Sequence, residues 1–231
     1  MNAAVLIPVF NEESSVGGVL DQVRMHFDGT ITVVDDGSTD RTPDILAARS
    51  DVRVVTLPHN CGYGCALATG FSDARASGVD SLITMDCDGQ HEPAHIPQFF
   101  AALAEGGDVI SGSRYLPQSR AVGTAPGRRR EVNRIVTETI NSVTGWGITD
   151  AFCGFKAYRL ASLDGIEVAE AGYAMPLELW AKVYRRGLSV REIPVERIYC
   201  DYDRTFGTEL DDPLLRLEYY LAVWHRALQE A

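Results

Sequence analysis

The first half of the chain alternates short apolar runs, rich in β-branched residues, with segments in which apolar residues recur at helical spacing. The predicted strands are AAVLIPV (3–9), TITVVDD (30–36), VRVVTLP (52–58), SLITMDCD (81–88) and DVISGS (108–113). The predicted helices lie between them, at residues 14–27, 40–49, 64–76 and 93–105. This order is typical of an α/β fold in which a single, Rossmann-like and mostly parallel sheet is sandwiched by helices.

The second half begins with LPQSRAVGTAPG (116–127), whose Gly, Pro and small residues predict a loop. The remaining predicted elements are an amphipathic helix headed by three arginines (128–143), a strand (151–159), a helix (176–186), a strand (188–199) and a closing helix (212–229). No repeat or linker separates two units. We therefore expect one domain over 1–231, with halves at 1–115 and 116–231.

Composition and charge exclude several functional classes. The chain has 21 Lys and Arg against 32 Asp and Glu, and its net charge of −11 opposes non-specific binding to nucleic acid. A phosphate-bearing partner must therefore meet a local basic cluster or a bridging metal ion. The five cysteines form no CxxC pair, which argues against a zinc finger and a disulfide framework. We expect a cytoplasmic protein, because no targeting segment is visible and no apolar run approaches about 20 residues.

Carboxylates gather at the ends of two predicted strands, and ligands of open parallel sheets bind at the carboxyl ends of strands. In DDGSTD (35–40), a tight turn carries an acidic side chain that can face a ribose or a base; a capped turn with solvated acids is the alternative. In DCDGQH (86–91), Asp86, Asp88 and Gln90 offer hard oxygen ligands for Mg²⁺ or Mn²⁺. Strand alternation would put Asp86 and Asp88 on one face, where a metal ion bridges to a diphosphate; a hydrogen-bonded loop is the alternative.

A dinucleotide-binding site is not expected, although Gly62 and Gly64 resemble half of a glycine-rich fingerprint. That fingerprint belongs in the turn after the first strand, where this chain has FNEE (10–13) and no glycine. Its third glycine is also missing, because Leu67 stands there. The pattern therefore argues against a nicotinamide-dependent dehydrogenase.

A series of motifs in order along the chain resembles family 2 glycosyltransferases of the GT-A fold, and among them the dolichyl-phosphate mannosyltransferase group. The motifs are IPVFNEE (7–13), VVDDGSTDRT (33–42), HNCGYGCALATG (59–70), MDCDGQHEP (85–93), SGSRY (111–115), TDAFCGFKAYR (149–159) and DRTFG (203–207). The resemblance implies inverting transfer of a hexose, from GDP-mannose or UDP-glucose, to a polyprenyl phosphate. It also implies a divalent ion, Mg²⁺ or Mn²⁺, on the diphosphate.

The resemblance assigns roles to residues of both halves. Residues 1–115 would bind the nucleotide sugar and residues 116–231 the acceptor. The nucleoside would be held by Pro8, Phe10, Glu12 and Asp36; the metal and diphosphate by Asp86, Asp88 and Gln90; phosphate groups by Arg114 and Arg204; and the acceptor phosphate by Arg129 and Asn133. The metal ligand Asp88 and the two arginines would act in catalysis, because they neutralise the charge that develops on the leaving diphosphate.

The nature of the acceptor decides whether a general base is needed. A phosphate is already anionic, whereas a saccharide or other hydroxyl acceptor needs a carboxylate within reach. Asp150 and Glu178 are the candidates for that base; their structural alternatives are a turn cap and a helix N-terminal acid. A non-catalytic nucleotide-sugar-binding protein is a third reading, against which the presence of all the carboxylates and arginines of the motifs argues.

The chain departs from the polyprenyl-phosphate enzymes in two respects. After DRTFG it reads TELDDP, where those enzymes usually carry Ser-Lys, so a cation near the acceptor site is missing. The C-terminal membrane helices of many relatives are also missing. With a lipid acceptor, we expect the protein to work peripherally at the inner membrane face or with a membrane partner protein.

Overall fold

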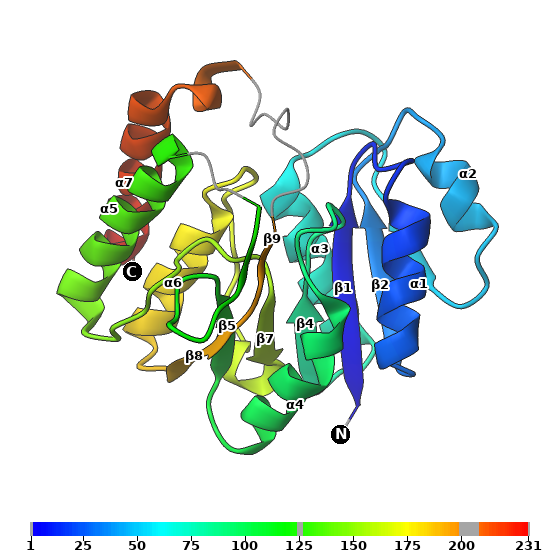
Figure 1. Ribbon diagram of the computed structural model, residues 1–231, viewed down its shortest axis with the longest axis horizontal. Helices are drawn as coiled ribbons and strands as arrows, with labels where there is room; N and C mark the ends of the chain where they lie inside the picture. The colour runs from blue at the N-terminus through cyan, green and yellow to red at the C-terminus, as the bar shows by residue number, and fades with distance from the viewer. Residues whose placement is uncertain (1, 124–126, 199–207, 231) are drawn as a thin grey trace.

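A seven-stranded sheet forms the centre of the computed structural model, which describes residues 2–123, 127–198 and 208–230, without the side chains of 127–129, 208 and 209. Its strands, in spatial order, are β3 (Arg53–Thr56), β2 (Thr30–Asp35), β1 (Ala3–Val9), β4 (Ser81–Thr84), β7 (Lys156–Arg159), β5 (Val109–Ser113) and β8 (Val190–Pro194). Both halves of the chain contribute strands to it (Figure 1).

The sheet is parallel except at β7, which runs antiparallel to β4 on one side and to β5 on the other. The other neighbouring strands of the sheet pair in parallel, as expected for the alternation of strands and helices in the first half. The reversed direction of β7 decides which segment lies at the carboxyl edge of the parallel strands. Because β7 starts where β4 and β5 end, the segment 150–155 enters the sheet at the edge formed by the carboxyl ends of its neighbours.

Helices cover both faces of the sheet (Figure 1). One face packs against α3 (Tyr63–Ala76), α5 (Gly127–Thr144), α6 (Met175–Arg185) and α7 (Pro213–Gln229), and the other against α1 (Val16–His26), α2 (Thr42–Ala47) and α4 (Ile96–Ala104). Strand β1 shows why: Leu6 belongs to the first core, while Val5 and Ile7 belong to the second. Successive side chains of a strand point to opposite faces, so a strand buried on both reads as one continuous apolar run.

The smaller elements complete the fold. Short 3₁₀ turns are η1 (Pro93–His95), η2 (Leu160–Leu163) and η3 (Thr208–Asp211). The predicted loop at 116–127 contains a two-residue strand, β6 (Ala121–Val122), which pairs in parallel with β9 (Arg197–Ile198). The loop prediction was therefore wrong at this point: the segment is anchored to the one that follows β8.

Several predicted strands are shorter than expected, and the difference at 81–88 bears on the chemistry. The predicted strand 151–159 begins only at Lys156, and the predicted strand 81–88 ends at Thr84. Asp86 and Asp88 therefore lie in the bend after β4, where strand alternation does not apply. Their expected position on one strand face was wrong, because the chain turns as soon as it leaves the sheet.

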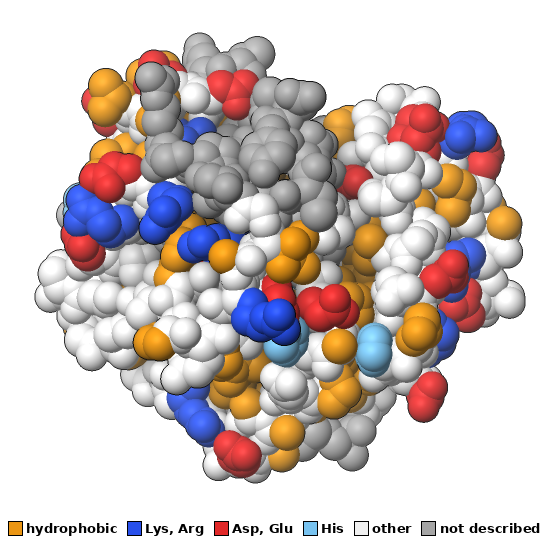
Figure 2. Space-filling model, in the orientation of Figure 1, with side chains coloured by type: hydrophobic (Ala, Val, Ile, Leu, Met, Phe, Trp, Pro, Cys, Tyr) orange, Lys and Arg blue, Asp and Glu red, His pale blue; other side chains and the backbone are white. Residues whose placement is uncertain are grey.

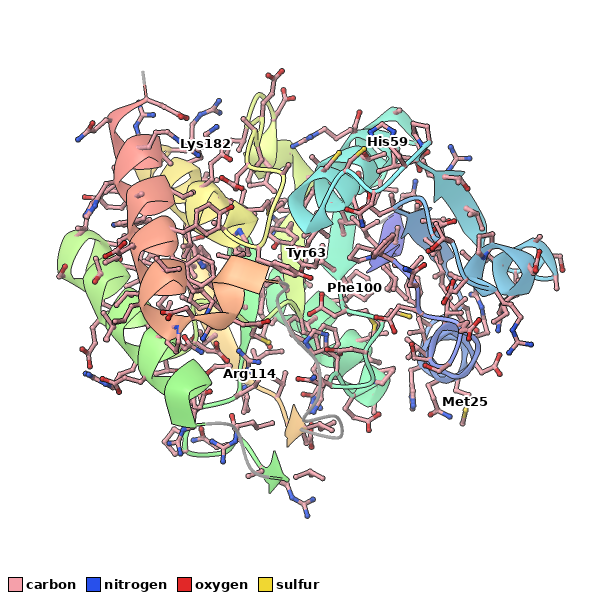
Figure 3. All side chains as sticks on the ribbon, turned by 90° about the horizontal axis from the view of Figure 1, so that it is seen from above. Met25, His59, Tyr63, Phe100, Arg114 and Lys182 are labelled. Carbon is pink, nitrogen blue, oxygen red and sulfur yellow. The ribbon has the colours of Figure 1, made fainter. Side chains whose placement is uncertain are left out.

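Charged side chains meet near the middle of one face of the molecule. Figure 2 shows acidic, basic and histidine side chains close together there. Seen from above, Tyr63 lies near the centre of the molecule, whereas Met25 lies at its outer edge (Figure 3). The centre of this face is where the two halves of the chain bring functional groups together.

Candidate active site

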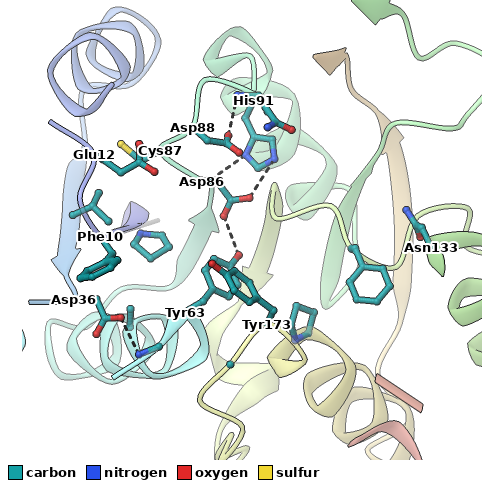
Figure 4. Close-up of a pocket in the computed structure, with 18 of the residues that line it drawn as sticks. Phe10, Glu12, Asp36, Tyr63, Asp86, Cys87, Asp88, His91, Asn133 and Tyr173 are labelled. Atoms are coloured by element: carbon teal, nitrogen blue, oxygen red, sulfur yellow. Dashed lines mark hydrogen bonds and ion pairs between the residues drawn. The ribbon is translucent and has the colours of Figure 1, made fainter. Parts of the chain in front are cut away.

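A cavity of about 660 Å³ opens at the carboxyl edge of the sheet, between the two halves of the chain (Figure 4). Its lining from the first half is Pro8, Val9, Phe10, Glu12, Asp36, Asn60, Gly62, Tyr63, Ala66, Asp86, Cys87, Asp88, Gln90, His91, Arg114 and Tyr115. Its lining from the second half is Val132, Asn133, Phe152, Gly172, Tyr173, Pro176, Arg216 and Tyr220. The cavity thus gathers most of the residues that the sequence predicts for a binding site, from segments far apart in the chain.

The turns after β1 and β2 are tied together at one end of the cavity. Asn11, in the left-handed region with φ 56°, accepts the backbone N–H of Thr39 at 2.8 Å and donates its own to Ser38 Oγ at 2.9 Å. Asparagine is one of the few residues that adopt this conformation readily. The turn presents Phe10 to the cavity with 42% of its surface exposed. An exposed aromatic ring in a cavity can stack on a planar base.

Asp36 lies beside this turn and is almost completely buried. Its two carboxylate oxygens accept the backbone N–H groups of Cys61 and Gly62, at 2.7 and 2.9 Å. Gly62 has φ 102°, and a Cβ there would meet the Ala171 carbonyl oxygen at 2.4 Å, so a larger residue cannot stand at this point. Asp36 therefore fixes the start of α3 while it lines the cavity.

Asp86 stands at the middle of the cavity, where Tyr63 and His91 contact it (Figure 4). The Tyr63 hydroxyl donates to Asp86 Oδ1 at 2.9 Å. The backbone N–H of Asp86 donates to His91 Nδ1 at 3.0 Å, which places the ring proton on Nε2, 3.7 Å from Asp86 Oδ2. Burial lowers the pKa of His91 to about 4, so the imidazole is neutral at pH 7. Burial also raises the pKa of Tyr63 well above its usual range, so its hydroxyl stays a donor.

Asp88 and Gln90 share the bend after β4 with Asp86. The backbone N–H of Gln90 donates to Asp88 Oδ1 at 3.0 Å, and both side chains line the cavity. In the described parts of the chain, no three His, Cys, Asp or Glu side chains are placed to hold a metal ion by themselves. Mg²⁺ sites often use one or two carboxylates, with substrate phosphates and water completing the shell. The two aspartates and the amide fit an ion bound together with a diphosphate.

The segment before β7 forms the wall behind Asp86. A Cβ on Gly154 would lie 2.3 Å from Asp86 Oδ2, so the carboxylate rests directly on glycine backbone. Thr84 Oγ1 donates to the Gly154 carbonyl at 2.8 Å, and the buried Lys156 ammonium donates to the Cys153 carbonyl. The antiparallel entry of β7 thereby brings the second half of the chain against the acidic bend of the first.

Arg114 is held at the end of β5 by a buried carboxylate. Its Nε and one terminal nitrogen donate to Asp150 Oδ2 and Oδ1 at 2.7 and 2.9 Å. Asn133 Nδ2 donates to the same Oδ1 at 2.8 Å, and Thr137 donates its hydroxyl to Asn133 Oδ1 at 2.9 Å. Burial alone would raise the pKa of Asp150, but the ion pair with Arg114 and these hydrogen bonds lower it. Asn133 lines the cavity and also supports the Arg114 ion pair.

Neither candidate for a general base is placed to act as one. Asp150 is fully buried against Arg114 and is not among the residues that line the cavity. Glu178 accepts the backbone N–H groups of Ala169 and Glu170 and is paired with Lys182, also outside the cavity. Burial by itself would raise the pKa of Glu178, but these hydrogen bonds lower it. Both carboxylates are structural in this fold.

The structure does not place every residue of the predicted site. Arg204 lies outside the described residues, and Arg129 lies in α5 at a position whose side chain is not described. Pro8, Glu12, Asp36 and the acidic bend all reach the cavity. The expected acceptor contact of Arg129 and the expected phosphate contact of Arg204 stay predictions.

Among the cavity side chains that the sequence motifs did not assign are Arg216, Tyr63 and Tyr173. Arg216 of α7 is only 4% exposed and donates to the Leu210 carbonyl at 2.7 Å. One signal could have found it, because Arg216 stands on the same stripe of the closing helix as the buried Tyr220. A charged residue on a buried stripe is rarely tolerated unless it is paired. The tyrosines carry no such signal.

The chain matches known proteins over most of its length. Residues 4–166 match the sequence profile of the family described as "Glycosyl transferase family 2". Polyprenol monophosphomannose synthase of Mycolicibacterium smegmatis is 31% identical over 83% of this chain and 75% of that protein. Dolichyl-phosphate hexose transferase of Haloferax volcanii is also 31% identical, over 83% of this chain and 81% of that protein.

A solved structure shares the fold. Glucosyl-3-phosphoglycerate synthase from Mycobacterium tuberculosis, in complex with Mn²⁺, uridine diphosphate and phosphoglyceric acid, superposes with a TM-score of 0.77. The alignment covers all of this chain and 79% of that one at 21% identity, which bears on the fold alone. The expected GT-A fold is confirmed. Because the family match spans the turns that carry Phe10, Asp36 and the acidic bend, the chain belongs to glycosyltransferase family 2.

Proposed function

We propose that the protein transfers a hexose from a nucleotide diphosphate sugar, GDP-mannose or UDP-glucose, to a polyprenyl phosphate, with inversion at the anomeric carbon. The observation that carries this proposal is the distribution of charge around the cavity. All carboxylates among the described lining residues come from the first half: Glu12, Asp36, Asp86 and Asp88. The described lining of the second half contains Arg216, Asn133 and apolar or aromatic side chains, but no carboxylate.

This distribution favours a phosphate acceptor over a hydroxyl acceptor. A hydroxyl group needs a carboxylate to take its proton, and the described lining of the acceptor side provides none. A phosphate needs no base, but it does need cations, and Arg114 and Arg216 both reach the cavity. Val132, Phe152 and Tyr220 offer apolar surface to the beginning of a polyprenyl chain. The names of the two relatives, a polyprenol and a dolichyl-phosphate enzyme, support the same class of acceptor.

The residues of the first half would act on the donor. In this proposal Phe10 and Asp36 bind the nucleoside, and Asp86, Asp88 and Gln90 hold a divalent ion on the diphosphate. The bound ion would supply charge neutralisation of the leaving diphosphate. Arg114, kept in place by Asp150, adds a second positive charge beside the bond that breaks. A phosphate oxygen of the acceptor attacks the anomeric carbon from the opposite side, and the nucleoside diphosphate leaves.

A lipid acceptor implies that catalysis takes place at a membrane surface. Among the described residues, no helix combines the length and the apolar character that crossing a bilayer requires. We therefore propose peripheral contact with the membrane during transfer. The test of the whole proposal is an assay of the purified protein with each nucleotide sugar, Mn²⁺ or Mg²⁺, and either a polyprenyl phosphate or a free saccharide. Transfer to the saccharide alone would contradict the acceptor assignment.

Asp36→Ala is expected to raise the KM for the nucleotide sugar about tenfold, because the N–H groups of Cys61 and Gly62 lose their acceptor and the start of α3 loosens. The kcat at saturating donor should change little, since contacts to the nucleoside stabilise ground and transition states alike. Steady-state kinetics with varied donor measures both constants. A loss confined to kcat, with unchanged nucleotide affinity, would place Asp36 in the chemical step instead.

Arg216→Met is expected to raise the KM for a polyprenyl phosphate about tenfold or more, since one charge-assisted hydrogen bond is lost. Methionine keeps much of the apolar stem that packs in α7. The matched control is Arg134→Met, which removes an arginine that is 54% exposed on α5. An unchanged acceptor KM in a folded Arg216→Met protein would remove Arg216 from the acceptor site.

A further inference from the structure

Two tyrosine rings lie between the donor side and the acceptor side of the cavity. Tyr63 comes from the first turn of α3, and Tyr173 comes from the loop 166–174 before α6. The rings stack at a centroid distance of 5.8 Å with 21° between their planes. Figure 4 shows the pair directly below Asp86. The Tyr63 hydroxyl donates to Asp86 Oδ1. Tyr173, from the second half of the chain, is therefore connected to the acidic bend through the Tyr63 ring.

The loop that carries Tyr173 is itself held firmly at its start. Its Ala169 and Glu170 N–H groups are bound by the buried Glu178 carboxylate of α6. Glu170 in turn accepts the Tyr219 hydroxyl of α7. Two helices of the second half therefore set the position of this loop.

The same loop also forms backbone hydrogen bonds with the first turn of α3. The Ala171 carbonyl accepts the N–H groups of Gly64 at 2.7 Å and Cys65 at 3.3 Å, which are amides of the first turn of α3. A Cβ on Gly64 would lie 2.1 Å from the Glu170 carbonyl oxygen, so the two backbones are in direct contact. Tyr63 stands in this turn. Its ring is thus oriented both by the backbone beneath it and by the Tyr173 ring beside it.

The carboxylate of Asp86 depends on this support for its orientation. Its Oδ2 faces the Gly154 backbone and the neutral His91 ring at 3.7 Å, which is too long for a hydrogen bond. The Tyr63 hydroxyl donates to Oδ1 at 2.9 Å, within hydrogen-bond distance. Without it, the side chain of Asp86, which is 30% exposed, could rotate toward the open cavity. A metal ligand that rotates loses part of its affinity, because orientation by a supporting hydrogen bond contributes to metal binding.

We propose that Tyr63 is a positioning residue that orients Asp86 for the divalent ion, and that Tyr173 and the loop 166–174 keep Tyr63 in place. This inference rests on the proposed function, since it takes Asp86 as a ligand of the ion on the diphosphate. In this inference the second half of the chain contributes to binding of the donor as well as to binding of the acceptor.

The test is a calorimetric titration of Mn²⁺ into the protein with UDP or GDP, without any acceptor. Tyr63→Phe keeps the ring stack and removes only the hydroxyl, and we expect its Mn²⁺ dissociation constant to rise about tenfold. Tyr173→Leu removes the stacked ring, and we expect a smaller rise in the same direction. The control, Tyr184→Phe, removes a hydroxyl from a tyrosine at the surface of α6 and should leave Mn²⁺ binding unchanged.

Activity and stability measurements separate the possible outcomes. In the transfer assay, excess Mn²⁺ should restore most of the kcat of Tyr63→Phe, as expected for a weakened ion site. A lower melting temperature with wild-type Mn²⁺ affinity would show a merely structural role and overturn the inference. Wild-type Mn²⁺ affinity in a fully stable Tyr63→Phe protein would overturn it as well. If the wild-type protein bound neither nucleotide with Mn²⁺, the proposed function itself would fail, and this inference with it.

Discussion

Asp88→Ala is expected to abolish sugar transfer, by at least about a thousandfold, while the protein stays folded. In the proposed mechanism a divalent ion would contribute several kcal/mol by neutralising the leaving diphosphate, and the loss of one of two carboxylates would leave it too weakly held to do so. Asp88 lies in a bend outside the sheet and belongs to neither hydrophobic core. Turnover with each nucleotide sugar, together with circular dichroism of the variant, measures the two parts of this prediction.

Two further variants make the result specific. Asp86→Ala should do nearly as much damage, because it removes the other carboxylate of the bend. Asp44→Ala removes an exposed aspartate of α2 that is remote from the cavity, and it should have wild-type turnover. If the Asp88 variant retained wild-type turnover after EDTA treatment and restoration of Mn²⁺, the metal assignment would be wrong.

Arg114→Leu is expected to lower the free energy of unfolding by about 3–5 kcal/mol and to stop transfer. The substitution leaves the fully buried Asp150 carboxylate without its ion-pair partner, and an unpaired buried charge is costly. Urea denaturation at pH 7 measures the change in stability. Arg53→Leu is the control: it breaks an ion pair with Asp73 in which the arginine side chain is 54% exposed, and exposed pairs contribute little.

The dependence of stability on pH gives an independent check of the same ion pair. The pKa of Asp150 is lowered in the folded protein, so its pairing stabilises the protein above the unfolded-state pKa, about 3.9. This contribution is lost as the pH falls through the folded-state pKa. The difference in unfolding free energy between wild type and Arg114→Leu should therefore be largest near neutral pH and shrink in acid. A difference that is constant from pH 7 to pH 3 would contradict the assignment.

Local sequence patterns predicted the elements of the fold because burial leaves a periodic signal along the chain. The continuous apolar run at 3–9 predicts a strand buried on both faces, and β1 is such a strand. The motif order predicted the family and the GT-A fold, both of which are confirmed. The same motifs named Phe10, Asp36 and Asp86, which the structure brings to one cavity. These residues lie next to strand ends, so their placement follows from local structure.

The exact end of a strand was harder to predict. The run SLITMDCD stays apolar up to Met85, which is buried, so its pattern extends past the last residue that pairs in the sheet. Pairing in a sheet depends on the neighbouring strands, and β7 pairs with β4 only from Ser81 to Thr84. The acidic bend therefore begins earlier than the pattern indicates.

What the sequence by itself determined about this protein is most of its elements, its family and its fold, each of which depends on patterns within short stretches of chain. Only the tertiary structure decided which distant groups meet. It set β7 antiparallel between β4 and β5, paired Asp150 with Arg114 outside the cavity, and brought Arg216 and Tyr63 to the cavity. The physical reason is that these contacts join residues tens of positions apart. Their geometry follows from how the sheet and the helices pack. Burial gives each element its own periodic pattern, but that pattern does not indicate which distant segments contact each other.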